Sequence, residues 1–420
     1  MTVHKGAFAA HKHELYPPTP TALLPAVPLG LRAVLDLVVS GEATSRAEIA
    51  RRTGLARSTV GQHVGHLLGH GLLEEIESGE SVRGRPPRVL TLSPRAGTVA
   101  VADVDTSGAQ VAIADLTGRM LARETVPVRI EAGPEAVLDA VAERVLALLE
   151  RTGRDPRRVR EVVLGLPGPV DVGRGCAVRP TGMPGWDGYP AAETLGVRFR
   201  APARVDNDAN LMALGEASRR EADTPLLCLK IGAGMGAGLV TASGDIYRGA
   251  DGAEGDVGHI PAADGGDSLC TCGNVGCVRA VASHRAVLRA LGIPETTDDD
   301  LRHGERELAE RIADSDPPAV RALREAATAI GEVAATLVLV YNPRTLVLGG
   351  PLSDLSDDLL SGVRAVVYRR ALPLTTRALI ITTTLPDGTA ALHGGIVLAL
   401  RDVFSAQGVA RLLVDDGEAD

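Results

Sequence analysis

The stretch LKIGAGMGAGL, residues 229–239, places four glycines at alternate positions after an apolar run. Further glycines lead from it to the pair Gly258-His259, namely Gly244, Gly249, Gly252 and Gly255. A single glycine-rich loop is weak evidence for a fold. The residues before it say more, because apolar runs at 99–102 and 111–114 are followed by a helical pattern at 136–149. Strand-like and helix-like runs in this order predict an α/β body from about residue 96 onward.

A cysteine cluster follows the glycine-rich stretch. Three of the five cysteines fall within eight residues, Cys270, Cys272 and Cys277, and His259 precedes them. Three thiolates and one imidazole complete a tetrahedral zinc shell, which is structural because no position remains for a substrate water. We therefore expect a structural Zn²⁺ held by these four side chains. The alternative is a set of reduced core cysteines beside an unrelated histidine.

Composition limits the class of protein. Hydrophobic residues form 45% of the 420 residues, aromatic residues only 2%, and the mean hydropathy is +0.10, as expected for folded cores of small aliphatic side chains. No apolar run approaches the roughly 18 residues that indicate a membrane span, and the first 30 residues lack a signal-peptide pattern. We expect a cytoplasmic protein without a membrane partner, with Cys176 and Cys228 in the core.

The net charge of −9 is unevenly distributed. Residues 31–95 carry nine Lys or Arg against seven Asp or Glu, a net charge of +2, which leaves −11 for the rest of the chain. Any DNA contact should therefore be local to this amino-terminal region. Residues 1–28 have no periodic apolar face and are expected to form a flexible tail.

Residues 29–95 have the pattern of a winged helix-turn-helix domain. The sequence SRAE at 45–48 is a capping box at the start of a second helix, where serine and glutamate satisfy each other's free amides. A third helix is expected from about residue 57 to Gly69, and a hairpin then forms the wing. The expected DNA contacts on the third helix and wing are Arg57, Ser58, Thr59, Gln62, His63, Arg83, Arg85 and Arg88. A small helical dimerisation module with a solvated basic turn is the alternative.

Several motifs in the body occur in the order typical of one family. Besides the glycine-rich stretch and the cysteine cluster, these are GLPGPVD at 165–171, PGW at 184–186, DNDAN at 206–210, NP at 342–343 and VLGG at 347–350. Together they resemble the ROK family of repressors and sugar kinases, over nearly the whole chain from about residue 30. The resemblance implies an α/β chain whose winged helix-turn-helix precedes a two-lobed, actin-like, ribonuclease-H-like ATPase fold of the sugar-kinase type. Lobe one is expected at about 96–210 plus the C-terminal helix, and lobe two at about 211–388.

The resemblance also implies a sugar site in the cleft between the lobes. Asn207 and Asp208 would grip adjacent sugar hydroxyls, and Asp208 occupies the position of the general base of the kinases. Asp256 stands where relatives have a glutamate, three residues before His259. Arg279 stands where relatives carry a second glutamate after the last cysteine. An inward-facing Arg279 would suit a phosphate or carboxylate, whereas an outward-facing one would be an ordinary surface arginine.

The phosphate-binding segment departs from the kinase pattern. Here the chain reads Asp103-Val104-Asp105-Thr106-Ser107, with Asp105 in place of a phosphate-facing glycine. Two like charges about 4 Å apart at a partly solvated site repel by about 4 kcal/mol, or roughly three decades in binding. We therefore do not expect ATP to be a cofactor. Alternatively, Asp105 turns to solvent or recruits a cation.

These features predict a transcriptional regulator, specifically a repressor of carbohydrate-related genes, whose catalytically degenerate cleft senses a sugar or sugar phosphate. A homodimer or homotetramer would bind double-stranded operator DNA with inverted repeats. One alternative is an active ATP-dependent hexose kinase that also binds DNA. Another is a regulator controlled by a protein partner, with a vestigial cleft.

Overall fold

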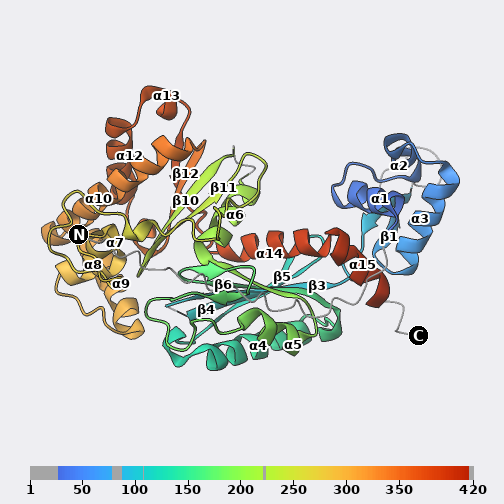
Figure 1. Ribbon diagram of the computed structural model, residues 1–420, viewed down its shortest axis with the longest axis horizontal. Coiled ribbons are helices and arrows are strands. Elements are labelled where there is room, and N and C mark those ends of the chain that lie inside the picture. Colours follow the sequence, from blue (N-terminus) through green and yellow to red (C-terminus); the bar gives the residue numbers. More distant parts are fainter. Residues whose placement is uncertain (1–26, 78–87, 107, 221–223, 416–420) are drawn as a thin grey trace, which may run out of the picture.

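The computed structural model describes residues 27–77, 88–106, 108–220 and 224–415 (Figure 1). A small helical domain with a two-stranded wing (blue in Figure 1) precedes a larger body that contains two separate sheets. We call the part built on the five-stranded sheet the first lobe and the part built on the four-stranded sheet the second lobe. The expected order, a winged helix-turn-helix followed by a two-lobed α/β body, is confirmed. Among the described helices, none is both long and apolar enough to cross a membrane.

The winged domain consists of three helices and one hairpin. Their bounds are α1 Leu29–Val39, α2 Arg46–Thr53, α3 Arg57–Gly69, β1 Leu73–Glu77 and β2 Arg88–Leu92. Each helix buries one apolar stripe, as the sequence periodicity predicts. The wing tip at 78–87 lies outside the described residues, and so do the expected DNA contacts Arg83 and Arg85.

The start of α2 differs slightly from a standard capping box. The Ser45 hydroxyl accepts a hydrogen bond from the Glu48 amide at 3.3 Å, as expected. The Glu48 carboxylate, however, accepts from the amide of Thr44 at 3.1 Å rather than from that of Ser45. Both groups still satisfy backbone donors at this terminus, and Gly54 in the left-handed region (φ 72°) ends the helix before the turn.

The first lobe has a five-stranded sheet in the order β5-β4-β3-β6-β9. Helices α4 and α5 cover one face, and α14 crosses the other (Figure 1). The strands are β3 Thr98–Asp105, β4 Gly108–Asp115, β5 Met120–Val126, β6 Val159–Leu166 and β9 Ala203–Asn207. The helices are α4 Pro134–Arg151, α5 Ala191–Phe199 and α14 Ala390–Val403, with short elements η1 Ile130–Ala132, η2 Pro156–Arg158, β7 Val170–Asp171 and β8 Cys176–Ala177.

The second lobe has a four-stranded sheet in the order β11-β10-β12-β13. The strands are β10 Leu226–Ile231, β11 Met235–Val240, β12 Thr345–Gly349 and β13 Ile380–Thr383. The longer helices are α9 Asp298–Ala313, α10 Pro317–Tyr341 and α12 Asp357–Arg370. The shorter ones are η3 Val257–His259, α7 Val278–Ala282, α8 His284–Ala290, α11 Pro351–Asp354 and α13 Pro373–Thr376. The β10–β11 hairpin carries the glycine-rich stretch, and its strand β11 meets the start of α6 (Asp208–Arg219), since a Cβ on Gly236 would lie 3.4 Å from that of Ala209.

Helices α6 and α14 cross at very short range. A Cβ on Gly215 of α6 would lie 1.8 Å from the carbonyl oxygen of Ala390, and one on Gly394 of α14 would lie 1.8 Å from that of Leu211. Side chains at these two positions would therefore force the helices apart. Because α6 also contacts β10 and β11, this helix pair joins the first lobe to the second.

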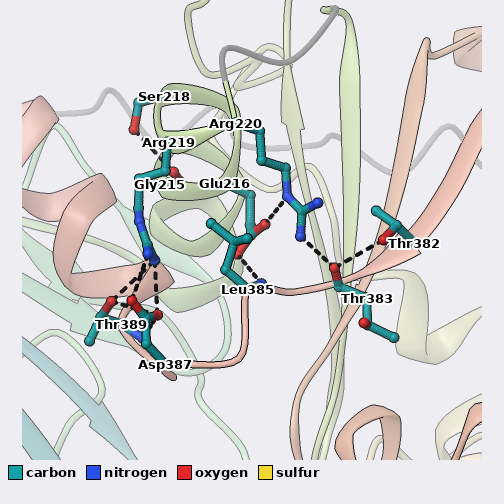
Figure 2. A network of polar contacts seen from close by, with 10 residues as sticks. All are labelled: Gly215, Glu216, Ser218, Arg219, Arg220, Thr382, Thr383, Leu385, Asp387 and Thr389. Atoms are coloured by element: carbon teal, nitrogen blue, oxygen red, sulfur yellow. Dashed lines mark hydrogen bonds and ion pairs between the residues drawn. The ribbon is translucent and has the colours of Figure 1, made fainter.

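The segment 384–389, which leads from β13 to α14, is fastened to the end of α6. Figure 2 shows that the buried Glu216 carboxylate accepts from Arg220 Nε at 2.5 Å and from the Leu385 amide at 3.0 Å. Arg219 forms a bidentate ion pair with Asp387, at 2.9 and 2.6 Å, and the hydrogen bonds from Arg219 hold the pKa of Asp387 well below its ordinary value. Residues 385 and 387 of this segment are thus tied to the end of α6.

The joint between the winged domain and the first lobe, residues 93–97, is also fixed. Arg154 donates to the Pro94 carbonyl at 2.6 Å, and Arg158 donates to the Arg95 carbonyl at 3.2 Å. A Cβ on Gly97 would lie 2.5 Å from Cγ of Arg160. One continuous apolar cluster includes the winged domain, the first lobe, α14 and α15 (Ala406–Asp415). The winged domain is therefore packed onto the body.

Candidate functional site

A buried ion cluster links the two lobes. Lys230 on β10 places Nζ 2.7 Å from Oδ2 of Asp105, at the end of β3, and 2.5 Å from Oδ2 of Asp208, the first residue of α6. Lys230 is only 9% exposed. Asp105 was expected either to face a phosphate, to turn to solvent or to recruit a cation. In the structure it forms an ion pair with a cation, the ammonium group of Lys230. Sequence reasoning did not identify Lys230.

The electrostatics of this cluster are set by burial and by one shared ammonium group. Burial alone would lower the pKa of Lys230, but Asp105 and Asp208 raise it well above its ordinary value. Burial alone would raise the pKa of Asp105, but Lys230 and the hydrogen bonds from Thr106 bring this pKa below its ordinary value. Burial raises the pKa of the neighbouring Asp103 to about 7, and its Oδ1 has no hydrogen-bond partner among the described residues. Ser107, also in the phosphate segment, lies outside them.

The kinase-base position is engaged by this cluster. Oδ1 of Asp208 accepts from the amide of Ala209 at 2.7 Å, while Oδ2 faces Lys230. Burial raises the pKa of Asp208. A general base must present a free oxygen to the hydroxyl it deprotonates. Each oxygen of Asp208 accepts from one protein donor in this arrangement, and the Lys230 ammonium stabilises the charge that a base would use.

Asn207 mainly caps helix α6. Its Oδ1 accepts from the amides of Ala209 and Asn210 at 2.9 and 3.3 Å, and its Nδ2 donates to the Gly168 carbonyl at 2.8 Å. One hydrogen of Nδ2 remains for a ligand, because the amide carries two.

Two further polar side chains near the start of α6 were missed by sequence reasoning. Asn210 Nδ2 donates to Oε1 of Glu254 at 2.9 Å. Oδ1 of Asn210 and Oε2 of Glu254 are buried and lack a hydrogen-bond partner in the described part of the chain. Buried polar atoms without partners are unusual in folded proteins and mark places where a water or ligand group binds. Asn210 lies in the DNDAN motif, so its helical spacing from Asn207 was the available signal.

Arg279 lies against two glycines, so it does not extend freely into solvent. It is part-buried on α7, and a Cβ on Gly234 would lie 3.5 Å from its Nη2. A Cβ on Gly258 would lie 3.4 Å from the Cβ of Arg279. The guanidinium group is therefore beside the 232–234 turn. Asp256 is half-exposed, with Oδ1 3.7 Å from Nε2 of His259.

Besides Lys230, the second lobe brings acidic side chains near Asp105. Burial, Asp354 and Asp105 together raise the pKa of Glu305 on α9, and burial raises the pKa of Asp354 at the end of α11. These carboxyl groups form a second group of acidic side chains on the second lobe, next to the ion cluster. They were not predicted from the sequence, since α9 and α11 carry no recognisable phosphate motif.

The four predicted metal ligands converge. The ligand atoms of His259, Cys270, Cys272 and Cys277 all lie within 4.8 Å of one another. Nδ1 of His259 is 3.5 Å from Sγ of Cys270, and Sγ of Cys272 is 3.8 Å from Sγ of Cys277. A tetrahedral zinc with Zn–S bonds of about 2.3 Å has S···S edges of about 3.8 Å. The cluster can thus hold a metal ion, and its chemistry suits zinc.

The third helix of the winged domain presents most of the expected DNA contacts. Arg57, Ser58 and Gln62 are exposed, whereas Thr59 and His63 are part-buried. The His63 ring lies beside α1, since a Cβ on Gly30 would be 2.8 Å from its Nε2. The imidazole ring of His63 thus packs against α1 and is only partly exposed to solvent.

At the wing, Arg88 is exposed but already paired. Its Nη1 lies 3.1 Å from Oε2 of Glu75, which also forms an ion pair with Arg46 of α2. Hydrogen bonds from Arg46 and Arg88 lower the pKa of Glu75. A phosphate contact by Arg88 would therefore compete with this exposed pair.

Comparisons with known proteins agree with both parts of the fold. Residues 32–76 match a helix-turn-helix domain model, and residues 101–402 match the model of the ROK family. The xylose repressor of Caldicellulosiruptor bescii is 25% identical over 383 residues, covering 89% of this chain and 95% of the repressor.

Two solved structures resemble the chain over different lengths. A ROK family transcriptional regulator, a homologue of the E. coli MLC protein, has a TM-score of 0.73 at 21% identity and covers 91% of this chain and 98% of its own. A ROK family glucokinase from Streptomyces griseus, in complex with glucose and AMPPNP, has a TM-score of 0.60 at 27% identity, with coverage of 72% and 99%. The family model spans more than half of the sequence, and the chain belongs to the ROK family.

Proposed function

We propose that this protein is a DNA-binding transcriptional regulator, a repressor of carbohydrate-related genes, whose kinase-like cleft senses a sugar or sugar derivative. The observation that carries the proposal is the winged domain joined to the ROK body, with Arg57, Ser58 and Gln62 exposed on α3. The similarity to the C. bescii xylose repressor extends over 89% of the chain and supports it.

The ion cluster supports a sensor rather than a kinase. Phosphoryl transfer would need Asp208 as a free base and a phosphate-binding segment without opposing charge. Instead Lys230 engages Asp208, and Asp105 occupies the phosphate segment. Glu305, whose pKa is raised by burial and by the neighbouring Asp354 and Asp105, adds a further acidic side chain near the phosphate segment. ATP is therefore not part of the proposal.

The remaining parts of the proposal concern ligands and assembly. Residues Asn207, Asp208, Asp256, His259 and Arg279 would form the effector site. His259 and the three cysteines would hold a structural Zn²⁺ that fastens the loop between η3 and α7. The tail at 1–28, the winged domain at 29–95 and the sensor at 96–420 would assemble as homodimers or homotetramers on inverted-repeat operators in the cytoplasm.

DNA selection with purified full-length protein tests the regulatory function. We expect enrichment of an inverted repeat and a weakening of its binding by about 1–3 kcal/mol in Gln62→Ala, because a base-reading contact is lost. The matched control is Arg289→Ala, an exposed arginine on α8 that pairs with Glu295. Recovery of random sequences only, or equal losses in both variants, would reject the proposal.

A coupled assay for ADP release separates the sensor from a DNA-binding kinase. We expect no sugar-dependent ADP release from the wild-type protein with any of the common hexoses and pentoses. Release that disappears in Asp208→Asn would establish the kinase. Loss or gain of operator binding on adding one carbohydrate supports sensing, and a footprint indifferent to every carbohydrate supports control by a protein partner.

A further inference from the structure

We infer that the effector carries an anionic group, a phosphate or a carboxylate, which is bound by Arg279 together with backbone amides of the turn at 232–234. This inference rests on the proposed function, because it specifies the chemical class of the ligand in the same cleft. It follows from the position of the Arg279 guanidinium group and from the amides of Ala233 and Gly234, which make no hydrogen bond within the described residues.

The guanidinium of Arg279 has no anionic partner among the described residues, although it is part-buried. Most other arginines of the body with similar burial are paired, such as Arg248 with Asp206 and Arg220 with Glu216. A part-buried cation loses hydration without compensation unless an anion binds to it. Arginine is also the side chain whose planar fork best fits phosphate and carboxylate oxygens.

The turn beside Arg279 offers two further donors. The amide of Gly232 donates to the Gly234 carbonyl at 2.9 Å. The amides of Ala233 and Gly234 make no hydrogen bond within the described part of the chain, and both residues are only part-buried. Two consecutive backbone amides without partners are available to donate to a bound anion. The guanidinium lies on this turn, since a Cβ on Gly234 would be 3.5 Å from Nη2.

Two glycines keep Arg279 in this position. A Cβ on Gly258 would lie 2.7 Å from the Met235 carbonyl oxygen and 3.4 Å from the Cβ of Arg279. The stem of the arginine therefore runs along Gly258 and its fork ends at Gly234. The positive charge of Arg279 therefore lies at the 232–234 turn.

The turn also adjoins the rest of the proposed effector site. A Cβ on Gly236, two residues after the turn, would be 3.4 Å from that of Ala209, which follows Asp208. Lys230 compensates one of the two carboxylates of Asp105 and Asp208, which reduces the negative charge that opposes the field of Arg279. A ligand with hydroxyl groups near α6 and one anionic group at the turn matches this distribution of donors and charges.

Binding measurements on full-length protein test the inference with matched ligand sets. For each hexose and pentose, isothermal titration compares the neutral sugar, its terminal phosphate ester and its uronic or aldonic acid. The phosphate and the acid arms distinguish the two sources of negative charge. We expect one charged form to bind at least 10-fold more tightly than its neutral parent, since a hydrogen bond to a charged group contributes about 1.5–3 kcal/mol.

Variants at position 279 locate the effect. Arg279→Gln should weaken the charged ligand by about 10- to 100-fold, and Arg279→Glu, which restores the acid typical of relatives, should abolish its binding. Arg289→Gln, on the neighbouring helix α8, is the control that should change nothing. A neutral sugar that binds as tightly as its charged forms, with Arg279→Gln unchanged, overturns this inference but leaves the sensor intact. A chain that binds no carbohydrate at all overturns the proposed sensing function itself.

Discussion

Replacement of Lys230 by methionine tests the ion cluster between the lobes. Methionine is similar in length but uncharged, so Asp105 and Asp208 would lose an ammonium at 2.7 and 2.5 Å while remaining buried. At an effective dielectric constant of about 20, each contact contributes about 6 kcal/mol of Coulomb attraction. Desolvation of the charges offsets much of it, and removal of one partner from a buried pair lowers the free energy of unfolding by about 3–5 kcal/mol. We expect a loss of this size.

Urea unfolding of the full-length protein at pH 8, followed by circular dichroism, measures this loss. In the double variant Lys230→Met/Asp105→Asn, at least half of the lost stability should return, because one uncompensated carboxylate is removed. The control Arg401→Met breaks an exposed ion pair with Asp245, whose side chains are 39% and 66% exposed, and should lose less than about 1 kcal/mol. A loss in Lys230→Met no larger than that of the control, or no recovery in the double variant, would refute the electrostatic reasoning.

Three further perturbations have defined outcomes. Burial raises the pKa of Asp103 to about 7, so the folded state keeps a proton that the unfolded state releases above about pH 4, and stability falls as the pH rises through this window. Between pH 5 and pH 8 the unfolding free energy of the wild type should drop by about 3 kcal/mol relative to Asp103→Asn; parallel pH profiles contradict this. Gly394→Ala should lower the free energy of unfolding in urea by about 1–3 kcal/mol, because the added methyl group overpacks the contact between α6 and α14. The control Gly61→Ala adds a methyl group in open space on α3 and should raise the free energy of unfolding by up to about 1 kcal/mol. Equal changes in the two variants would count against the close crossing of α6 and α14. Cys272→Ser should reduce the zinc content measured by mass spectrometry and weaken effector binding before DNA binding, and full zinc content in this variant would rule out the proposed ligand set.

Local signals in the sequence predicted the winged domain well. The apolar spacing, the Ser45 cap and Gly54 act over three or four residues, and α3 begins at Arg57 and ends at Gly69 as expected. The metal ligands are also local in sequence, apart from His259, and they converge as predicted. These features depend on short-range geometry that residue identity largely determines.

The ion cluster depended on contacts between distant parts of the chain. Lys230 is the only lysine after residue 12 and stands in the otherwise apolar strand β10, which was the available signal. Its partners lie 125 and 22 residues earlier, on two other elements, so their identity follows only from how the lobes meet. Asn207 was expected to bind a sugar hydroxyl, and the backbone amides that it caps are visible only in the folded helix.

The close crossing of α6 and α14 has a mechanical consequence. With glycine at both contact points, the two helices meet backbone to backbone and have no side-chain layer there that could be compressed or rearranged. Helix α6 begins at Asp208 in the cleft, and α14 leads into α15, within the apolar cluster that includes the winged domain. A ligand that shifts the start of α6 would therefore displace the far end of α14 by rigid translation. The displacement would reach the DNA-binding surface, because the winged domain packs in the same apolar cluster as α14 and α15.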